Sequence, residues 1–435
     1  MNKNVLNKIA TAMLAAGLAV ALAACGGGSG NTSSNAGPPA ASGSGNAAPL
    51  SAAQSYVGTV SFGDTVRIDI DQPSAGQLTL TFLDSQFGLA GTLVGPYKAS
   101  GNTYAAGTLS AGTGAPAALS TAAAGIQLTL QIATDASHHG IMTGTLQNVP
   151  NLKANDGSHL QGQVQASNNG VTTVAALAGT YSFVKLSGNY TAGGVPQGSQ
   201  DAEAGQIKIN ADGTMRFCSG QPWSDSCTNY DQDTGTSSPT TGTIAVDPNQ
   251  TLYPGAFDIV LNGSPLGRAF VSTSNGRTSL FVDQAGTNSD GTFRTGSWVL
   301  TTSTALAAGA ADGTWTCSEP GVADNSNQLT GTTQVSTERF AGTQLTPLNA
   351  NGSIDGTQQP VPLFYNQTFD PKASQSQLTL ASSPVNGLIA GEWIGSFQNQ
   401  TVTGALMFLP ISATQIAYLD EVNANGFFVM GSCTQ

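Results

Sequence analysis

Apolar and polar residues alternate along much of the chain after residue 50. The segment 66–71 alternates valine or isoleucine with arginine or aspartate, and the segment 77–82 alternates glutamine or threonine with leucine or phenylalanine. A period of two residues is typical of a β-strand with one buried face and one polar face. Further runs of this kind lie at 126–133, 141–147 and 160–167. We therefore expect strands in these segments, with Arg67, Asp69 and Asp71 on the solvent side.

Turn signals separate the later apolar runs. Pairs of aspartate or asparagine with glycine stand between such runs at 212–213, 275–276 and 425–426. These pairs favour two-residue β-hairpin turns, because both residues tolerate positive φ. Helical periodicity is absent over any long stretch, so the alanine-rich segment 115–124 and the segment 301–311 are the candidates for a short helix, a loop or a linker. The sequence thus predicts an all-β chain of antiparallel hairpins.

A short motif recurs and suggests that the hairpins form repeated units. The sequence GTVSF at 58–62 returns as GTYSF at 179–183 and more loosely as GTWTC at 313–317, at spacings of 121 and 134 residues. After the first two copies, the segment 75–80 corresponds to 204–209. Each section holds about eight strand candidates, which is enough to close a small antiparallel barrel or to stack as a sandwich.

The repeats, together with the composition of the N-terminal region, divide the chain into five segments. We expect a signal peptide at 1–24, a flexible Gly/Ser/Ala/Pro tether at 25–50, and three β-domains at 51–172, 175–308 and 311–435, with the alternative that the last two domains form one unit. A mature chain of this length is longer than one hydrophobic core usually serves.

The N-terminal segment resembles the signal of bacterial lipoproteins. Lys3 and Lys8 precede an uncharged apolar stretch, 9–22, that leads into Leu22-Ala23-Ala24-Cys25, which is similar to the family's lipobox. The stretch is too short to remain as a membrane-spanning helix. The resemblance implies cleavage before Cys25, acylation of its thiol and new amine, including palmitate, and stable anchoring by several acyl chains. Gly26 follows the cysteine, whereas an aspartate there is the family's signal for retention at the inner membrane, so an outer-membrane lipoprotein of Gram-negative type is expected, facing the periplasm or the cell surface.

The segment that follows the lipobox has the composition of a tether. Residues 26–50 carry no charge and almost no bulky apolar side chain. Such a segment cannot bury enough surface to fold. As a random coil of this length it would hold the folded part about 25–30 Å from the lipid.

Charge excludes several classes of partner. Removal of residues 1–24 takes away two of the 13 lysine and arginine residues and no acid, which leaves 11 basic side chains against 25 acidic ones. Nucleic acid and anionic lipid headgroups are bound through clustered lysine and arginine, and the sequence contains no such cluster. We therefore expect no nucleic-acid partner, and contact with the membrane only through the lipid on Cys25.

Four cysteines besides Cys25 lie in an exported chain. An even number in an oxidising compartment indicates two disulfides, with three connectivities to choose from. The choice that is local in the sequence joins Cys218 to Cys227 and leaves Cys317 for Cys433. A zinc site built from four cysteines lacks the closely paired spacing that such sites show.

Candidate catalytic and metal-binding residues are few. The three histidines, His138, His139 and His159, lie in polar, loop-like stretches, and motifs of hydrolases, zinc proteases, P-loops or dinucleotide-binding folds are absent. The segment 229–235 is superficially similar to a calcium loop, but its glycine falls one position late and Thr240 stands where a glutamate would bind. We therefore expect no catalytic residue, no metal and no cofactor.

Acidic pairs leave one catalytic alternative open. Asp69 with Asp71, and Asp231 with Asp233, are the pairs that a glycan-directed envelope hydrolase would use. The scarcity of histidine, lysine and arginine argues against it, since enzymes usually need such groups to stabilise developing charge. The expected function is instead a non-catalytic binding or interaction module that takes a protein, a glycan or a small apolar molecule.

Three tripeptides resemble the Gly-x-Trp openings of lipocalin-like barrels. They end at Trp298, Trp315 and Trp393. The resemblance implies that an aromatic ring seals one end of a barrel. The alternative is an aromatic plug in an ordinary β-core.

Overall fold

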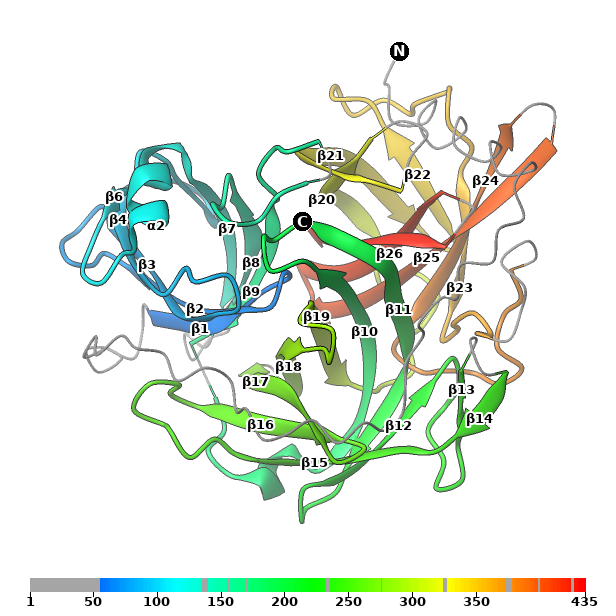
Figure 1. The fold of residues 1–435 in the computed structure, drawn as a ribbon. Helices are drawn as coiled ribbons and strands as arrows, with labels where there is room; N and C mark the ends of the chain where they lie inside the picture. The colour runs from blue at the N-terminus through cyan, green and yellow to red at the C-terminus, as the bar shows by residue number, and fades with distance from the viewer. Residues whose placement is uncertain are drawn as a thin grey trace.

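The chain folds into three closed β-barrels that pack against one another (Figure 1). The structure is a computed structural model, and it describes residues 55–134, 140–154, 156–168, 170–231, 235–274, 276–323, 327–371, 378–397, 400–423 and 426–435. Every strand pairing among these residues is antiparallel. The predicted all-β architecture of antiparallel domains is confirmed, as barrels rather than sandwiches.

Barrel 1 is drawn in blue and cyan in Figure 1. Its strands are β1 (Ser55–Val60), β2 (Asp64–Ile70), β3 (Gln77–Ser85), β4 (Gly91–Ser100), β5 (Thr103–Ala106), β6 (Ser110–Ala111), β7 (Gln127–Thr134), β8 (Gly140–Gln147) and β9 (Gly162–Ser167). The pairing of β3 with β4 closes a ring of eight strands, and β6 lies beside β4. The helix α2 (Ala117–Ala122) and the 3-10 turn η1 (Ala123–Gly125) fall in the alanine-rich segment and place Leu119 in the core of the barrel.

Barrel 2 follows in green. After the 3-10 turn η2 (Val174–Leu177) come β10 (Gly179–Tyr190), β11 (Pro196–Ile209), β12 (Thr214–Ser219), β15 (Thr240–Val246), β16 (Ala256–Leu261), β17 (Ser264–Ser274), β18 (Arg277–Thr287) and β19 (Phe293–Thr302). The small sheet of β13 (Asn229–Asp231) and β14 (Thr236–Ser238) is inserted between β12 and β15.

Barrel 3 runs from yellow to red. It consists of β20 (Gly313–Val322), β21 (Leu329–Ala341), β22 (Gln344–Leu348), β23 (Val361–Tyr365), β24 (Ile389–Phe397), β25 (Gln400–Ser412), β26 (Gln415–Asn423) and β27 (Phe427–Thr434). In all three barrels the first strand pairs with the last, through β1–β9, β10–β19 and β20–β27. The finer expectation, that 51–172, 175–308 and 311–435 are separate folding domains, stays a prediction.

The repeated glycine motif marks the first strand of each barrel. Gly179 and Gly313 begin β10 and β20, and Gly58 lies in β1. The aromatic residue two positions later closes one end in barrels 2 and 3: the Tyr181 hydroxyl donates to the Leu177 carbonyl at 2.8 Å, and Trp315 Nε1 donates to the Ala311 carbonyl at 2.9 Å.

The second part of the proposed repeat is wrong in its alignment. The segment 75–80 leads into β3, the third strand of barrel 1, whereas 204–209 belongs to β11, the second strand of barrel 2. Short motifs that alternate glycine with β-formers match by period alone, so these two segments share a strand pattern and not a place in the fold.

The barrels bury parts of their outer faces against one another. One apolar cluster joins Val184 and Val299 of barrel 2 with Leu388, Leu409 and Leu419 of barrel 3, and it also includes Ile141 of barrel 1. A sheet that is covered on both sides shows no exposed polar face. The expectation that Arg67 and Asp69 lie in solvent is therefore wrong, because their side chains are only 9% and 8% exposed and form an ion pair at 2.9 Å.

Among the described residues, none of the helices combines the length and apolarity needed to cross a membrane.

Candidate functional site

The interior of barrel 2 is organised in layers from its closed end to its mouth. Above Tyr181, the rings of Phe183, Phe217 and Trp298 pack together, with centroids 4.6 Å apart for Phe183–Phe217 and 5.5 Å apart for Phe217–Trp298. Lys185 lies over this layer, with Nζ 4.9 Å from the Trp298 ring centre and 5.2 Å from the Phe217 ring centre. These residues share one parity on their strands, so the barrel closes them into one column.

Charged side chains fill the mouth above Lys185. Lys185 Nζ lies 2.8 Å from Glu203 Oε1 and 3.0 Å from Asp201 Oδ2, and Arg294 Nη2 lies 3.1 Å from the same Asp201 oxygen. The Lys185 side chain is 7% exposed, whereas those of Asp201, Glu203 and Arg294 are 35%, 26% and 24% exposed. Solvent therefore reaches the upper three groups but not the lysine. We call Lys185, Asp201, Glu203 and Arg294 the charged mouth.

Burial and mutual charge shift the pKa values in the charged mouth. Burial alone raises the pKa of Asp201, but the charges of Lys185 and Arg294 outweigh it and hold that pKa well below its usual range. Burial, together with the neighbouring charge of Asp201, raises the pKa of Glu203. Burial lowers the pKa of Lys185, but the two carboxylates outweigh it and raise that pKa. A proton entering the pair therefore goes to Glu203 before Asp201.

Below the mouth, side chains fill the barrel. A cavity of about 10 Å³ remains among Ile207, Met215, Ile244 and Leu280, next to Trp298. This volume holds one water molecule at most. A small apolar molecule, one of the expected partners, therefore has no room inside barrel 2. The three Gly-x-Trp tryptophans are core residues, with Trp298, Trp315 and Trp393 2–7% exposed.

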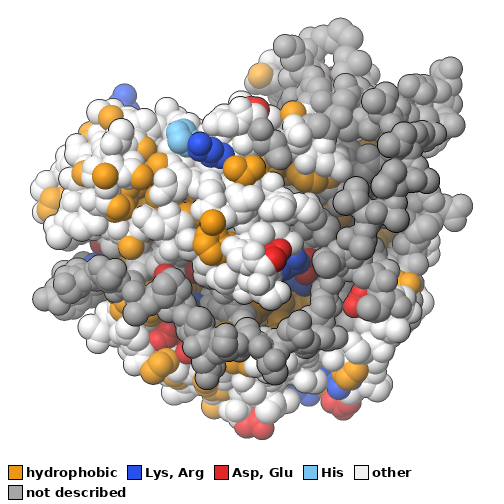
Figure 2. Space-filling view, viewed as in Figure 1, with side chains coloured by type: hydrophobic (Ala, Val, Ile, Leu, Met, Phe, Trp, Pro, Cys, Tyr) orange, Lys and Arg blue, Asp and Glu red, His pale blue; other side chains and the backbone are white. Residues whose placement is uncertain are grey.

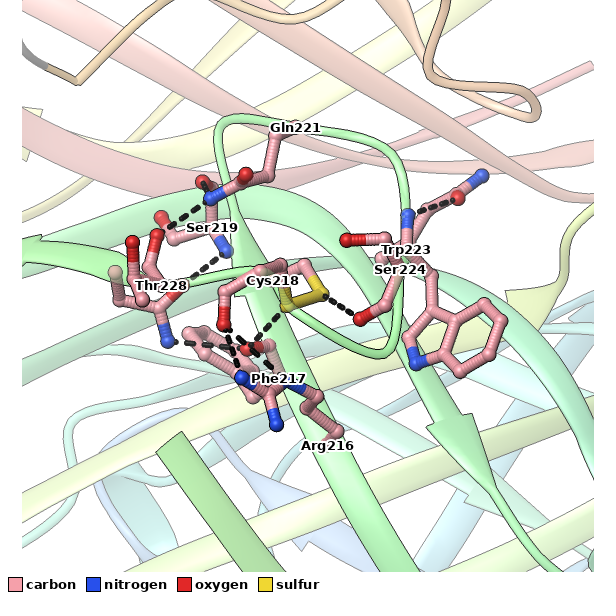
Figure 3. Close-up of a disulfide and its surroundings, with 11 residues drawn as sticks. Arg216, Phe217, Cys218, Ser219, Gln221, Trp223, Ser224 and Thr228 are labelled. Carbon is pink, nitrogen blue, oxygen red and sulfur yellow. Dashed lines mark hydrogen bonds between the residues drawn. A yellow bond between two sulfur atoms is a disulfide. The ribbon is translucent and has the colours of Figure 1, made fainter. Parts of the chain in front are cut away.

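The first disulfide lies at the edge of barrel 2 that faces barrel 3 (Figure 3). Cys218 and Cys227 are bonded, with Cα atoms 5.8 Å apart. The loop between them is tied down from both sides, because Arg216 donates from Nη2 to the Cys227 carbonyl at 2.6 Å and Gln221 donates to the Thr228 carbonyl at 2.7 Å. This is the local pairing that the sequence predicts.

The loop also contacts barrel 3. Gly220 has φ +63, and a Cβ atom on it would lie 2.1 Å from Pro371 Cδ, so only glycine fits here. The Trp223 backbone amide donates to Gln206 Oε1 at 2.9 Å, and Gln206 Nε2 reaches the Asn386 carbonyl at 3.3 Å. The disulfide thus holds a loop that helps to join two barrels.

The second disulfide joins the first and last strands of barrel 3. Cys317 in β20 faces Cys433 in β27, and their Cα atoms are 3.9 Å apart. This is the second pairing that the sequence predicts. The Cα atoms are closer than the usual 4.4–6.8 Å of disulfides.

The other candidate residues do not form a site. Cys25, His138, His139 and Asp233 lie outside the described residues. His159 is exposed and forms a strand bridge with Lys153. Within the described ranges, groups of three or more histidine, cysteine or acidic residues arranged to hold a metal ion do not occur.

Of the predicted acidic pairs, the pair Asp69 and Asp71 binds other groups, whereas the pair Asp231 and Asp233 lies partly outside the described residues. Asp69 is bound to Arg67 and Ser55, and Asp71 accepts hydrogen bonds from the Gly76 amide at 2.8 Å and the Tyr97 hydroxyl at 2.7 Å. In the calcium-like segment, Asn229 instead fixes the disulfide loop: its side chain accepts from the Ser219 amide at 2.8 Å.

Sequence reasoning missed the charged mouth, although one signal pointed to it. Lys185 lies two positions after Phe183 in the repeated motif and therefore has the same inward parity as Tyr181 and Phe183. A lysine on the apolar side of a strand is rarely buried without a charged partner. Its partners cannot be found by spacing alone, because they lie on β11 and β19.

No protein-family model matches the chain, and no curated protein matches it. Among solved structures, the chain is similar to a point mutant of the vaccine antigen transferrin binding protein B (TbpB) from Haemophilus parasuis, with 11% sequence identity over 85% of this chain and a TM-score of 0.19. The match spans 65% of that protein's chain, which is less than two thirds of its length. A TM-score this low establishes no common fold.

Proposed function

We propose that the chain is a lipid-anchored, non-catalytic binding protein of the Gram-negative outer membrane. The lipobox ending at Cys25 supports the anchor, and the tether at 26–50 separates it from the barrels. The charged mouth of barrel 2 carries the proposal for binding, since it gathers partly exposed groups of both signs over a buried aromatic layer. Convergent polar groups with shifted pKa values are typical of binding sites.

The character of the mouth favours a partner with charged or hydrogen-bonding groups of its own. The filled interior below it rules out a deeply inserted apolar molecule. Figure 2 shows few charged side chains on the displayed face, with acidic and basic groups next to each other near its centre. A protein or glycan that contacts the charged mouth from outside, without entering the barrel, fits these features.

An envelope hydrolase is the second candidate, and one observation favours it: two neighbouring carboxyl groups have pKa values shifted in opposite directions. Their geometry argues against it. Asp201 and Glu203 are hydrogen-bonded to each other and share Lys185, whereas a glycosidase pair stands about 5–9.5 Å apart with the sugar between.

The binding proposal is tested with protein purified from its own envelope. Native mass spectrometry of the wild type should show an additional bound mass, and Asp201→Asn/Arg294→Gln should lose it. The matched control is Asp290→Asn in an exposed turn, which should retain the mass. An identical mass on all three proteins would reject the mouth as the site.

The anchor is tested separately. Cys25→Ser should release the chain from the membrane fraction, and globomycin should cause the uncut precursor to accumulate. Membrane retention and processing that stay the same in both tests would reject lipidation at Cys25.

A further inference from the structure

Two buried aspartates face each other where barrel 1 meets barrel 2. Asp64 opens β2, and Asp283 lies in β18; they are 0% and 2% exposed. Thr65 of barrel 1 donates its hydroxyl proton to Asp283 Oδ2. Within the described residues, Asp283 Oδ1 and both Asp64 oxygens lack a hydrogen bond of normal geometry, although the Ser85 hydroxyl and the Gln86 backbone lie close enough to Asp64 to influence it.

The nearby cation is already committed to other groups. Arg268 of barrel 2 lies 2.7 Å from Asp84 of barrel 1, through Nη1, and 3.0 Å from Asp247, through Nε. Its guanidinium also stacks over the Tyr253 ring at 3.7 Å, and the Tyr253 hydroxyl donates to Asp84 at 3.3 Å.

Among the described residues, the titratable groups around the Asp64–Asp283 pair carry more negative than positive charge. The facing groups are Asp84 from β3, Arg268 from β17, and, around Arg268, Asp247, Tyr253 and Asp258. Burial raises the pKa of Asp283 to about 7. Burial, together with the charge of Asp283, raises the pKa of Asp64 well above its usual value.

The remainder of this junction combines polar with apolar contacts. The Thr59 and Ser297 hydroxyls lie 3.1 Å apart, and Ser167 donates to the Val271 carbonyl at 2.8 Å. Barrel 1 contacts barrel 3 in a similar way, since Gln415 donates to the Ile141 carbonyl at 3.2 Å. Apolar contact between barrels 1 and 2 consists of a cluster around Phe270 and Val57 and of the Phe87 ring of barrel 1, which packs against Tyr190 and Phe293 of barrel 2. Interfaces of this composition between domains are commonly reversible.

Barrel 1 is also free of covalent cross-links to the other two barrels. Both disulfides close loops inside barrel 2 or barrel 3. Each barrel closes its own hydrogen-bonded ring and has its own core, so separation would break no strand ladder. Barrel 1 is joined to barrel 2 by the connection between β9 and β10.

We propose that the junction between barrels 1 and 2 is a proton-operated latch, closed while Asp64 and Asp283 are protonated and released when both become ionised. Release would expose Thr59 and Ser167 of barrel 1, which are 0% and 6% exposed and contact Ser297 and Val271 of barrel 2. The latch is independent of the charged mouth and of the anchor.

The direction of the pH effect follows from linkage. In separated barrels both carboxyl groups return to solvent and ionise near pH 4. In the docked state they keep their protons to higher pH, so docking takes up protons and weakens as the pH rises from about 4 through the docked-state pKa. Each group that changes its protonation alters the docking equilibrium by up to about tenfold per pH unit.

The latch is measured by the reactivity of a buried thiol. Thr59→Cys places a reporter in the junction of the full mature chain, and Ser237→Cys places the matched reporter on the exposed strand β14. The ratio of their maleimide labelling rates removes the intrinsic pH dependence of thiol chemistry. If Thr59→Cys does not fold, Ser297→Cys places the reporter thiol on the barrel 2 side of the same junction.

We expect the ratio of buried to exposed labelling to rise at least about tenfold between pH 5.5 and 7.5 in the wild-type background. Asp64→Asn/Asp283→Asn, which imitates the protonated pair, should keep the ratio low at both pH values. A ratio that does not change with pH in the wild-type background would overturn the latch. A rise of the same size in the Asn variant would overturn it as well.

Discussion

Lys185 of barrel 2 and Glu319 of barrel 3 occupy equivalent positions and carry opposite charges. Each lies six residues after the glycine that begins the first strand of its barrel, and each points inside, at 6% and 9% exposure. Lys185 rests on an aromatic layer and binds carboxylates, whereas Glu319 Oε2 accepts from the buried Tyr418 hydroxyl at 3.0 Å. The two barrels therefore share the same first-strand geometry, but the inward position six residues after the glycine holds a cation in barrel 2 and a carboxyl group in barrel 3.

Removal of the buried cation should destabilise barrel 2. Lys185→Met leaves Asp201 and Glu203 facing each other without their common partner, at a cost of about 2 kcal/mol at pH 7, less than for a fully buried pair because solvent reaches both carboxylates. Chemical denaturation measures the loss. The exposed Lys98→Met is the matched control and should change stability by less than about 0.5 kcal/mol.

The same variant should show a defined pH dependence. The low pKa of Asp201 means that its ion pair stabilises the fold above the ordinary carboxyl pKa and is lost as the pH falls through the lower, folded value. The gap in stability between wild type and Lys185→Met should therefore be largest near neutral pH and shrink below about pH 4. A gap of constant size across this range would contradict the assigned role of Lys185.

The two disulfides should differ in what they stabilise. Cys317 and Cys433 close a loop with a sequence separation of 116, against 9 for Cys218 and Cys227. Loop entropy predicts a loss of up to about 4.7 kcal/mol for Cys317→Ser/Cys433→Ser and about 2–3 kcal/mol for Cys218→Ser/Cys227→Ser. Amide exchange should locate the first loss in barrel 3.

The connectivity itself is checked by non-reducing peptide mapping of the mature protein. Peptides that join Cys218 to Cys433, or Cys227 to Cys317, would contradict both pairings. Equal losses in the two double variants would instead show that loop length does not decide the effect.

Two turn glycines provide a matched pair for backbone strain. In the turns 210–214 and 288–292, an aspartate side chain accepts a hydrogen bond from the backbone amide of the threonine two residues later. The glycine between them has φ +86 at Gly213 and φ +83 at Gly291. Gly291→Ala meets open space and should cost about 1 kcal/mol from φ alone. Gly213→Ala should cost more, because its Cβ would lie 2.4 Å from the Ile244 carbonyl oxygen. Thermal unfolding ranks the two, and the opposite order would refute this explanation.

The sequence predicted the local features of this fold and missed the contacts between strands that are distant in the sequence. Alternation located β3 and β11, and the Asp212-Gly213 pair located a hairpin, because each depends on neighbours along the chain. The burial of Asp69 was not predictable in this way. Alternation reports that two faces differ, but it cannot tell whether the polar face meets water or other parts of the fold.

The sites show the same limit. Lys185 carried a readable signal in its parity, but Asp64 and Asp283 are 219 positions apart and meet only because two complete barrels dock. Cysteine pairing was accessible because four cysteines allow few connectivities and a closed barrel brings its first and last strands together.

Photo-crosslinking at the charged mouth tests the central claim most directly. A photoreactive phenylalanine analogue replaces Gln197, an exposed residue that pairs with Asn189 beside Arg294, and in a second protein it replaces Ala245 on the exposed outer face of β15. Irradiated in its own envelope, the chain should form a discrete adduct from position 197 and none from position 245. Adducts of equal yield from both positions, or none from position 197, would contradict a binding function at the mouth of barrel 2.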